Sequence, residues 1–323
     1  MDSTLECYNN GIDTDDMPNK HLDHLEDLIL YGRREATNAV NEVMNNPKLS
    51  VKWDGAPAIV FGTDPRNGKF FVGTKSVFNK IKVKICYDQT DIDNYYKGVL
   101  ADILRLCWHN LPRIGGIVQA DFIGVGGGCV YRPNTLEYRF SEATTGNIVL
   151  AAHTAYTEIS HDAIGYGGIN IYGEDTAQFV GSNEADAHIE KLPDFNWIKF
   201  LLRVARCKIP SAKVRPMISK HINSFIRAGR VPRPQEMYDS LDDKYKCEIN
   251  VTTFKVWHML YELKERLLEN IKVTGSVKCY IDGKPTEHEG FVTVAEHPIK
   301  IVDRLTFSKA NFNLDKNWTN EKI

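Results

Sequence analysis

The sequence predicts an α+β fold. Two groups of short apolar runs, within residues 49–156 and 276–304, have the lengths and the turn residues of antiparallel strands. Between them, residues 195–271 repeat apolar side chains at steps of three and four, as amphipathic helices do. We therefore expect a strand-rich core that is divided in the sequence by a helical region.

The composition is that of a globular protein, because 42% of the 323 residues are hydrophobic and 25% are charged. No apolar run approaches the length of a membrane span, and residues 1–20 are polar and acidic, without a signal-peptide core. We expect a flexible leader at 1–20 and a protein of the cytoplasm, or of the host cytoplasm if a virus encodes it. The seven scattered cysteines form no Cys-x-x-Cys pair, which argues against a disulfide framework and a zinc site.

The first element is an expected helix from Leu22 to Val43, which ends before Pro47. His24, Glu26 and Asp27 lie near its start. A metal site there is conceivable, but charged side chains at a helix start are more often in contact with water. We interpret them as a solvated helix end.

Strands follow, and the first carries the stretch Val51-Lys52-Trp53-Asp54-Gly55 at its end. Leu49 to Lys52 is a predicted strand, Asp54 and Gly55 form a tight turn, and Ala58 to Gly62 is the next strand. A lysine at a strand end is held rigidly, and it becomes a nucleophile once it loses its proton. The alternative is a hairpin turn with a surface lysine beside it.

The following segments add one more lysine and one acid. Lys75 follows a third strand, which Asn67-Gly68 joins to the second as a hairpin. A helix containing Ile92 to Cys107 precedes the apolar strand from Ile117 to Ile123, and this strand carries Asp121. An acid in a buried strand needs a partner, so Asp121 is a candidate functional residue. Further strands are expected at 129–131, 135–140 and 147–153.

The helical region is strongly basic. We expect helices near 195–207, 216–228, 234–246 and 252–271. Between Lys191 and Arg233 eleven Lys and Arg residues face a single acid, Asp194, within a chain of net charge −2. Solvated helix faces usually mix both signs, so this excess indicates an anionic partner, with nucleic-acid phosphates the leading candidate. The residues expected to contact nucleic acid are Arg203, Arg206, Lys208, Lys213, Arg215 and Lys220.

The last strands bring a carboxylate and a lysine. Glu289-Gly290 opens an apolar strand, and Lys300 lies inside the run from Pro298 to Arg304. Two interpretations stay open: a structural ion pair, or a metal-coordinating acid with a phosphate-binding cation.

Taken in order, these motifs resemble those of the covalent nucleotidyltransferase superfamily, which contains ATP-dependent DNA ligases, RNA ligases and mRNA capping enzymes. The motifs are Lys52-Trp53-Asp54-Gly55, Lys75, Asp121, Glu289-Gly290-Phe291-Val292 and Ile299-Lys300-Ile301. Residues 21–156 and 275–312 look most like uncharacterised phage-encoded proteins of the RNA ligase branch. The resemblance implies an antiparallel, ATP-grasp-like ligase adenylation core at 21–157 and 274–323, interrupted by a basic helical insertion at 158–273.

The resemblance also implies a role for each matched residue. Lys52 would attack the α-phosphate of ATP and hold AMP as a phosphoramide, and Lys300 would contact that phosphate. Glu289 would support a Mg²⁺ or Mn²⁺ ion, and Asp121 would bind the ribose. Lys75 would hold the nucleotide or a 5′-phosphate, with Asp54 and Gly55 beside it. His153 and Tyr156 are both candidates to stack on the base.

The chain departs from the family pattern in the last motif, where Val302 stands in place of a second lysine. Arg304 is the candidate to supply the missing charge. About twenty residues follow Lys300, too few for an oligonucleotide-binding barrel, which favours RNA over DNA as the substrate. The expectation is an ATP-dependent RNA ligase. The alternatives are a DNA ligase or guanylyltransferase of the same superfamily, or a non-catalytic nucleic-acid-binding relative.

Overall fold

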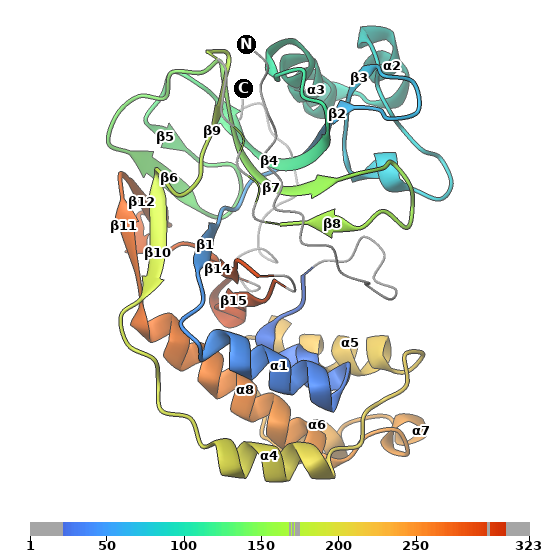
Figure 1. The fold of residues 1–323 in the computed structure, drawn as a ribbon, viewed down its shortest axis with the longest axis vertical. Helices are drawn as coiled ribbons and strands as arrows, with labels where there is room; N and C mark the ends of the chain where they lie inside the picture. The colour runs from blue at the N-terminus through green and yellow to red at the C-terminus, as the bar shows by residue number, and fades with distance from the viewer. Residues whose placement is uncertain (1–21, 168, 170, 172–174, 296–297, 308–323) are drawn as a thin grey trace.

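The structure is a computed structural model that describes residues 22–167, 169, 171, 175–295 and 298–307. The expected leader at 1–20 lies outside the described residues. Figure 1 shows the larger sheets at one end of the molecule and most of the helices at the other, with a small sheet of β1, β14 and β15 between them. The sheets are antiparallel apart from one parallel pairing between β7 and β9, so the α+β class predicted from the sequence is confirmed.

The largest sheet has the strand order β3-β2-β4-β7-β8, with β9 pairing on β7. Two helices, α2 and α3, pack against it through a core that contains Phe61 of β2, Leu104 of α3 and Leu150 of β7. The elements of this part are β2 (Ala58–Thr63), β3 (Phe70–Gly73), η2 (Lys75–Phe78), α2 (Gln89–Tyr95), α3 (Gly98–Asn110), β4 (Ile117–Val125), β7 (Ile148–Tyr156), β8 (Gly165–Tyr166) and β9 (Ala177–Phe179).

The other strands form three smaller sheets. A four-stranded sheet has the order β13-β12-β6-β5, a two-stranded one joins β10 to β11, and the third has the order β1-β14-β15. Their bounds are β1 (Leu49–Lys52), β5 (Val130–Tyr131), β6 (Glu137–Phe140), β10 (Ala185–Ile189), β11 (Ile271–Gly275), β12 (Val277–Ile281), β13 (Lys284–Thr286), β14 (Gly290–Thr293) and β15 (Lys300–Val302).

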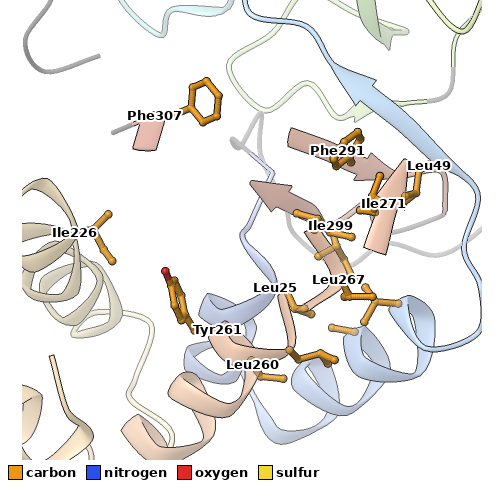
Figure 2. Close-up of a cluster of buried hydrophobic side chains, with 14 of the residues drawn as sticks. Leu25, Leu49, Ile226, Leu260, Tyr261, Leu267, Ile271, Phe291, Ile299 and Phe307 are labelled. Atoms are coloured by element: carbon orange, nitrogen blue, oxygen red, sulfur yellow. The ribbon is translucent and has the colours of Figure 1, made fainter. Parts of the chain in front are cut away.

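The helical part assembles around α8 (Val251–Asn270), which packs against the N-terminal η1 and against α4, α6 and β15. Figure 2 shows the shared core: Leu25 of η1 and Leu267 of α8 lie near Ile299, and Leu49 of β1 lies near Phe291 of β14. One continuous core therefore joins the helices to the β1–β14–β15 sheet. The remaining helices are η1 (Leu25–Leu30), α1 (Arg33–Val43), α4 (Trp197–Arg206), α5 (Arg215–Arg227), α6 (Pro234–Asp239) and α7 (Asp243–Lys246).

Three expected helices are each divided in two. The helix expected at 22–43 breaks at Gly32, which has an extended backbone between η1 and α1. The helix expected around 92–107 breaks at Tyr96 and Lys97, both extended, before Gly98 at a φ of 60°. The helix expected at 234–246 becomes α6 and α7. Glycine has a low helix propensity, which accounts for the break at Gly32.

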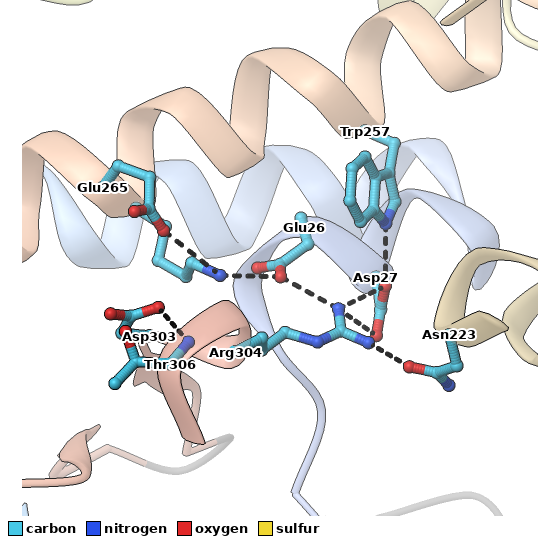
Figure 3. Close-up of polar contacts among 9 residues, drawn as sticks. Glu26, Asp27, Asn223, Trp257, Glu265, Asp303, Arg304 and Thr306 are labelled. Carbon is cyan, nitrogen blue, oxygen red and sulfur yellow. Dashed lines mark hydrogen bonds and ion pairs between the residues drawn. The ribbon is translucent and has the colours of Figure 1, made fainter. Parts of the chain in front are cut away.

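The acidic start of the first helix is buried, and its interpretation as a solvated end was wrong. Lys264 of α8 donates to Glu26 at 2.8 Å, and neither side chain is exposed to solvent. Arg304 donates to Glu26 at 2.9 Å and to Asp27 at 3.1 Å, as Figure 3 shows. Burial acts to raise the pKa of Glu26, but the charges of Lys264 and Arg304 outweigh it and hold that pKa well below its usual range. Burial raises the pKa of Asp27. This network ties η1 to α8 and to the segment after β15.

No helix among the described residues is both long and apolar enough to cross a lipid bilayer.

Candidate functional site

Two lysines share one face of the β1–β14–β15 sheet. Lys52 ends β1 and pairs with Gly290 of β14, and Lys300 begins β15 and pairs with Val292 of β14. Directly paired residues point to the same side of a sheet, as do residues two apart on a strand. Lys52 and Lys300 are therefore diagonal neighbours across β14, although 248 positions separate them in the sequence.

Gly290 makes this arrangement possible because the sheet is tightly packed around it. A Cβ atom at Gly290 would lie 2.6 Å from both the carbonyl oxygen of Ile301 and Cγ2 of Val302. Val302 itself is 3% exposed and pairs with Gly290. The position at which the nucleotidyltransferase motif would have its second lysine is thus a buried valine.

The ammonium group of Lys52 forms an ion pair with the carboxylate of Glu289, the residue before β14. The Lys52 side chain is 26% exposed and that of Glu289 is 10% exposed. Burial acts to lower the pKa of Lys52, but the attraction and hydrogen bond of Glu289, with smaller contributions from Asp54 and Asp121, raise it overall. Lys52 is therefore protonated in this state and must lose its proton before it can act as a nucleophile.

Lys300 has the opposite shift. Burial and the neighbouring charge of Lys52 lower the pKa of Lys300 to about 8, although Glu289 and Asp23 act to raise it. Lys75, an exposed residue at the start of η2, also contributes to the lowering. Three lysines thus lie close enough to repel one another, and an anion bound between them would relieve that repulsion.

The turn after β1 is fixed by contacts to two other strands. The N–H of Asp54 donates to the hydroxyl of Tyr138 at 2.6 Å, and Asn134 donates to Oδ1 of Asp54 at 3.1 Å. A Cβ atom at Gly55 would lie 2.8 Å from Cβ of Asp121 and 2.9 Å from the carbonyl oxygen of Phe122. Glycine at this position lets the turn lie directly against β4, which brings Lys52 and Asp121 into one site.

The Asp54 carboxylate is buried and only partly satisfied. It is 8% exposed, and its Oδ2 atom has no hydrogen-bond partner among the described residues. Burial and repulsion by Glu289 raise the pKa of Asp54 to about 6. A buried oxygen without a donor can accept a proton or bind a cation.

His153 lies next to Asp121 at an irregularity of the large sheet. Ala120 pairs with Ala152 and Gln119 with Thr154, so His153 is the extra residue of a β-bulge. Its Nε2 atom is 3.7 Å from Oδ1 of Asp121, and its side chain is 41% exposed. Bulges often redirect a side chain beside a functional site.

Tyr156, the other candidate ring, is part of the core. It is 6% exposed, its ring centroid lies 4.5 Å from that of Phe78, and its hydroxyl donates to Gln119 at 3.1 Å. Burial raises its pKa to about 12. Of the two candidates for stacking on a base, His153 has the accessible ring.

Arg304 does not join the site. Its guanidinium group donates to Glu26, to Asp27 and, at 2.6 Å, to Asn223 of α5. With its donors used in this buried network, Arg304 supplies no charge to replace the lysine missing at Val302. Sequence spacing alone could not show this, because all three partners lie far from Arg304 in the chain.

The basic residues of the helical region lie in different surroundings. Arg215 of α5 stacks on Tyr31 at 4.2 Å and donates to the carbonyl oxygen of Leu30 at 3.1 Å. The ammonium group of Lys208 donates to the carbonyl oxygen of Cys247. In Figure 1, α1 and α8 lie between α4 and the β1–β14–β15 sheet. Arg203 and Arg206 lie on α4, and Lys213 and Lys220 are exposed, the latter on α5.

Sequence reasoning missed His288, which precedes Glu289. It is buried against Trp53 with ring centroids 5.1 Å apart, and neither ring nitrogen has a hydrogen-bond partner among the described residues. Burial lowers its pKa to about 4, so the imidazole is neutral at pH 7. The contact between the His288 and Trp53 rings holds the residue after Lys52 against the residue before Glu289. Its adjacency to Glu289 is the only sequence signal for it.

The residues of the site fit a magnesium ion that takes only part of its ligands from the protein. No group of three or more His, Cys, Asp or Glu side chains that could hold a metal occurs within the described ranges. Mg²⁺ often takes one or two carboxylates and completes its shell with water and substrate phosphates. Glu289 and the unpartnered Oδ2 of Asp54 are two such oxygen ligands, so this donor set fits an ion that arrives with a nucleotide.

Comparison with known protein families shows a match over most of the chain. No curated protein and no solved structure matches it. A protein-family model described as "Family of unknown function (DUF6267)" matches residues 19–252 and 248–316. The chain therefore belongs to this family of unknown function.

Proposed function

We propose that the protein is a nucleotidyltransferase that forms a covalent lysyl-AMP at Lys52 and acts as an ATP-dependent polynucleotide ligase. The observation that carries the proposal is the convergence of Lys52, Glu289 and Lys300 at the β1–β14–β15 sheet. An ion pair between Lys52 and Glu289 alone would be a structural feature. A second lysine of lowered pKa on the same face gives the site the charge of a phosphate-binding pocket.

In the first step the Nζ atom of Lys52 forms a bond to the α-phosphorus of ATP. The bond between that phosphorus and the bridging oxygen of the β-phosphate breaks, and pyrophosphate leaves with the electron pair. The lysine loses two protons in total, one before the attack and one as the N–P bond forms. Both protons pass to water, the first when the ion pair with Glu289 is lost.

The remaining side chains position and stabilise the phosphate. Lys300 and Lys75 provide positive charge where the α-phosphate and the leaving pyrophosphate gain negative charge. A Mg²⁺ or Mn²⁺ ion held by Glu289 and Asp54 would neutralise phosphate charge and compete with the ammonium group for the Glu289 carboxylate. Loss of that ion pair lowers the pKa of Lys52 and favours the neutral amine.

Asp121 and His153 provide the groups for the nucleoside. The Asp121 carboxylate can accept hydrogen bonds from ribose hydroxyls, and the exposed ring of His153 beside it can stack on the base. In the later steps AMP passes to a 5′-phosphate, and a 3′-hydroxyl displaces it to join the strands. The family resemblance favours RNA over DNA as the substrate.

The test is to incubate the protein with Mg²⁺ and α-labelled ATP or GTP and to look for label that survives denaturation. We expect label from ATP in the wild type and none in Lys52→Ala. Lys284→Ala is a matched control because Lys284 is an exposed lysine of β13, which belongs to a different sheet. Label at equal levels in Lys52→Ala would refute the assignment of the nucleophile. Preference for GTP would indicate capping-type chemistry.

One observation favours a second candidate, a non-catalytic nucleic-acid-binding relative. Val302 is buried where the family pattern has a lysine, and Arg304 is engaged elsewhere, so β15 supplies one cation to the site. In that case folded protein would bind ATP, detectable by calorimetry, but no covalent label would form with either nucleotide.

A further inference from the structure

A cavity of about 760 Å³ lies on the helical part of the molecule, formed by α4, the start of α6 and α8. Lys255, His258, Glu262 and Arg266 line it from one face of α8, with spacings of three, four and four residues. Trp257 and Lys264 contact η1 from the opposite face of the same helix. The cavity and the Lys52 site are therefore on different sides of α8.

The charged residues that line the cavity are mainly cationic. Lys199 and Arg203 of α4 and Lys255 of α8 line it, and none of the three forms an ion pair within the described parts of the chain. Arg266 also lines the cavity; its Nη1 atom donates to the carbonyl oxygen of Asp194 at 2.7 Å and its Nε atom to that of Glu262 at 3.3 Å. The cations therefore keep most of their hydrogen-bonding capacity for a ligand.

The two acids of the cavity do not neutralise this charge. Glu262 lies 3.3 Å from Nδ1 of His258 and is occupied in part by that contact, and Asp194 lies at the edge formed by the segment before α4. Four Lys and Arg side chains thus face two carboxylates in one cavity. Clustered cations of this kind favour an anionic ligand.

Size and shape limit the ligand. Pockets for small ligands typically enclose about 300–1,000 Å³, so this cavity has room for a nucleotide unit or two. It is an open hollow bordered by three helices, and Phe195 in its lining packs against Trp197 and Phe200 with ring centroids 5.3 Å away in both cases. A single strand fits a hollow of this size because it can place a phosphate among the cations and a base near Phe195.

We infer that this cavity binds a segment of single-stranded nucleic acid through its phosphates, as an anchoring site separate from the Lys52 site. The choice of nucleic acid as the ligand rests on the proposed function. The cavity also revises which basic residues make contact. It includes Arg203 and adds Lys199, Lys255 and Arg266, whereas Lys208 and Arg215 are held by internal contacts.

The test compares two charge reversals of equal size. Lys199→Glu with Lys255→Glu alters the cavity, and Lys272→Glu with Lys284→Glu is the matched control, since both of its lysines are exposed on strands outside the cavity. Binding of a fluorescent single strand of about 12 nucleotides, RNA or DNA, is measured by anisotropy at several salt concentrations. Each phosphate contact to a single strand contributes roughly 0.7 to the slope of log K against log salt.

We expect the cavity variant to bind at least about tenfold more weakly than the wild type, with the salt slope reduced by about 1.4. The control should stay within about twofold of the wild type. Equal weakening of both variants would show that only net charge matters, and unchanged binding by the cavity variant would also overturn the inference. Lys199→Gln with Lys255→Gln keeps similar side-chain size and should give an intermediate loss, and circular dichroism of each variant checks its folding.

Failure of this inference is distinguishable from failure of the proposed function. The cavity variants should form lysyl-AMP as fast as the wild type, because their substitutions lie across α8 from Lys52. Absence of label in the wild type would refute the proposed function and leave the binding measurement valid. Normal label with unchanged strand binding by the cavity variant would refute the anchoring site alone.

Discussion

Replacing Lys300 by methionine should make the protein more stable and less active. Methionine has a similar length and no charge, so it removes the cost of keeping an ammonium group in a partly buried position beside Lys52. The pKa of Lys300 falls from 10.5 to about 8 on folding. At 1.36 kcal/mol for each pKa unit, this difference corresponds to about 3 kcal/mol at pH 7.

The cost has a definite pH dependence. Below pH 8 Lys300 is protonated in both the folded and the unfolded protein, and the full cost is present. Between about pH 8 and 10.5 the unfolded chain binds the proton and the folded protein does not, so the stability of the wild type rises with pH. The advantage of Lys300→Met should therefore shrink from about 3 kcal/mol at pH 7 to about 1.5 kcal/mol at pH 9.5.

The assay is urea unfolding of the wild type and of Lys300→Met at both pH values. Lys284→Met is the control, because Lys284 is an exposed lysine of a different sheet and its replacement should change the free energy of unfolding by less than about 0.5 kcal/mol. Labelling from ATP should fall by roughly 10²–10³-fold in Lys300→Met, as expected for loss of a group that stabilises the transition state. A variant that is no more stable than the wild type at pH 7, or whose advantage is the same at pH 9.5, would refute the reasoning.

Three further changes test the packing around the site, each measured by urea unfolding. Lys264→Met should cost about 3–5 kcal/mol, because it leaves the buried Glu26 with Arg304 as its one remaining ion-pair partner in the described chain, and a cost below 1 kcal/mol would contradict a buried pair. Gly55→Ala should cost about 1–3 kcal/mol and reduce labelling, since its Cβ would lie 2.8 Å from that of Asp121; Gly115→Ala, with no atom within 4 Å of its added Cβ, is the control and should be near neutral. Tyr138→Phe should cost about 1–3 kcal/mol by removing the acceptor of the Asp54 N–H, and an unchanged stability would mean that this N–H finds another partner.

The local pattern of the sequence predicted most of the elements. The strand at Leu49–Lys52 was predicted with the bounds that the structure shows, and α4, α5 and α8 begin within two residues of the expected positions. Alternating and three-to-four-residue apolar spacings depend only on nearby residues, so they can be recognised without the fold. The helix breaks at Gly32 and Tyr96 were missed because the apolar spacing continues across them.

Identifying the candidate site required both the sequence pattern and the tertiary structure. Residue types and order singled out Lys52, Asp121, Glu289 and Lys300, but not which pair with one another. Strand register decided that Lys52 and Lys300 share a face across Gly290, and a β-bulge decided that His153 is accessible. Burial separated Tyr156 from His153, a choice that the sequence left open.

The sequence by itself thus determined the class of fold, most of the strands and helices, and the charged residues available for chemistry. Only the tertiary structure decided which charges are used internally. The sequence indicated a solvated helix end for Glu26 and Asp27 and a place in the nucleotide site for Arg304, yet the three side chains meet beside α8 and neutralise one another. A buried charge is stable only beside its partner, and here the partners are more than 200 residues apart, so their roles depend on contacts that no local pattern contains.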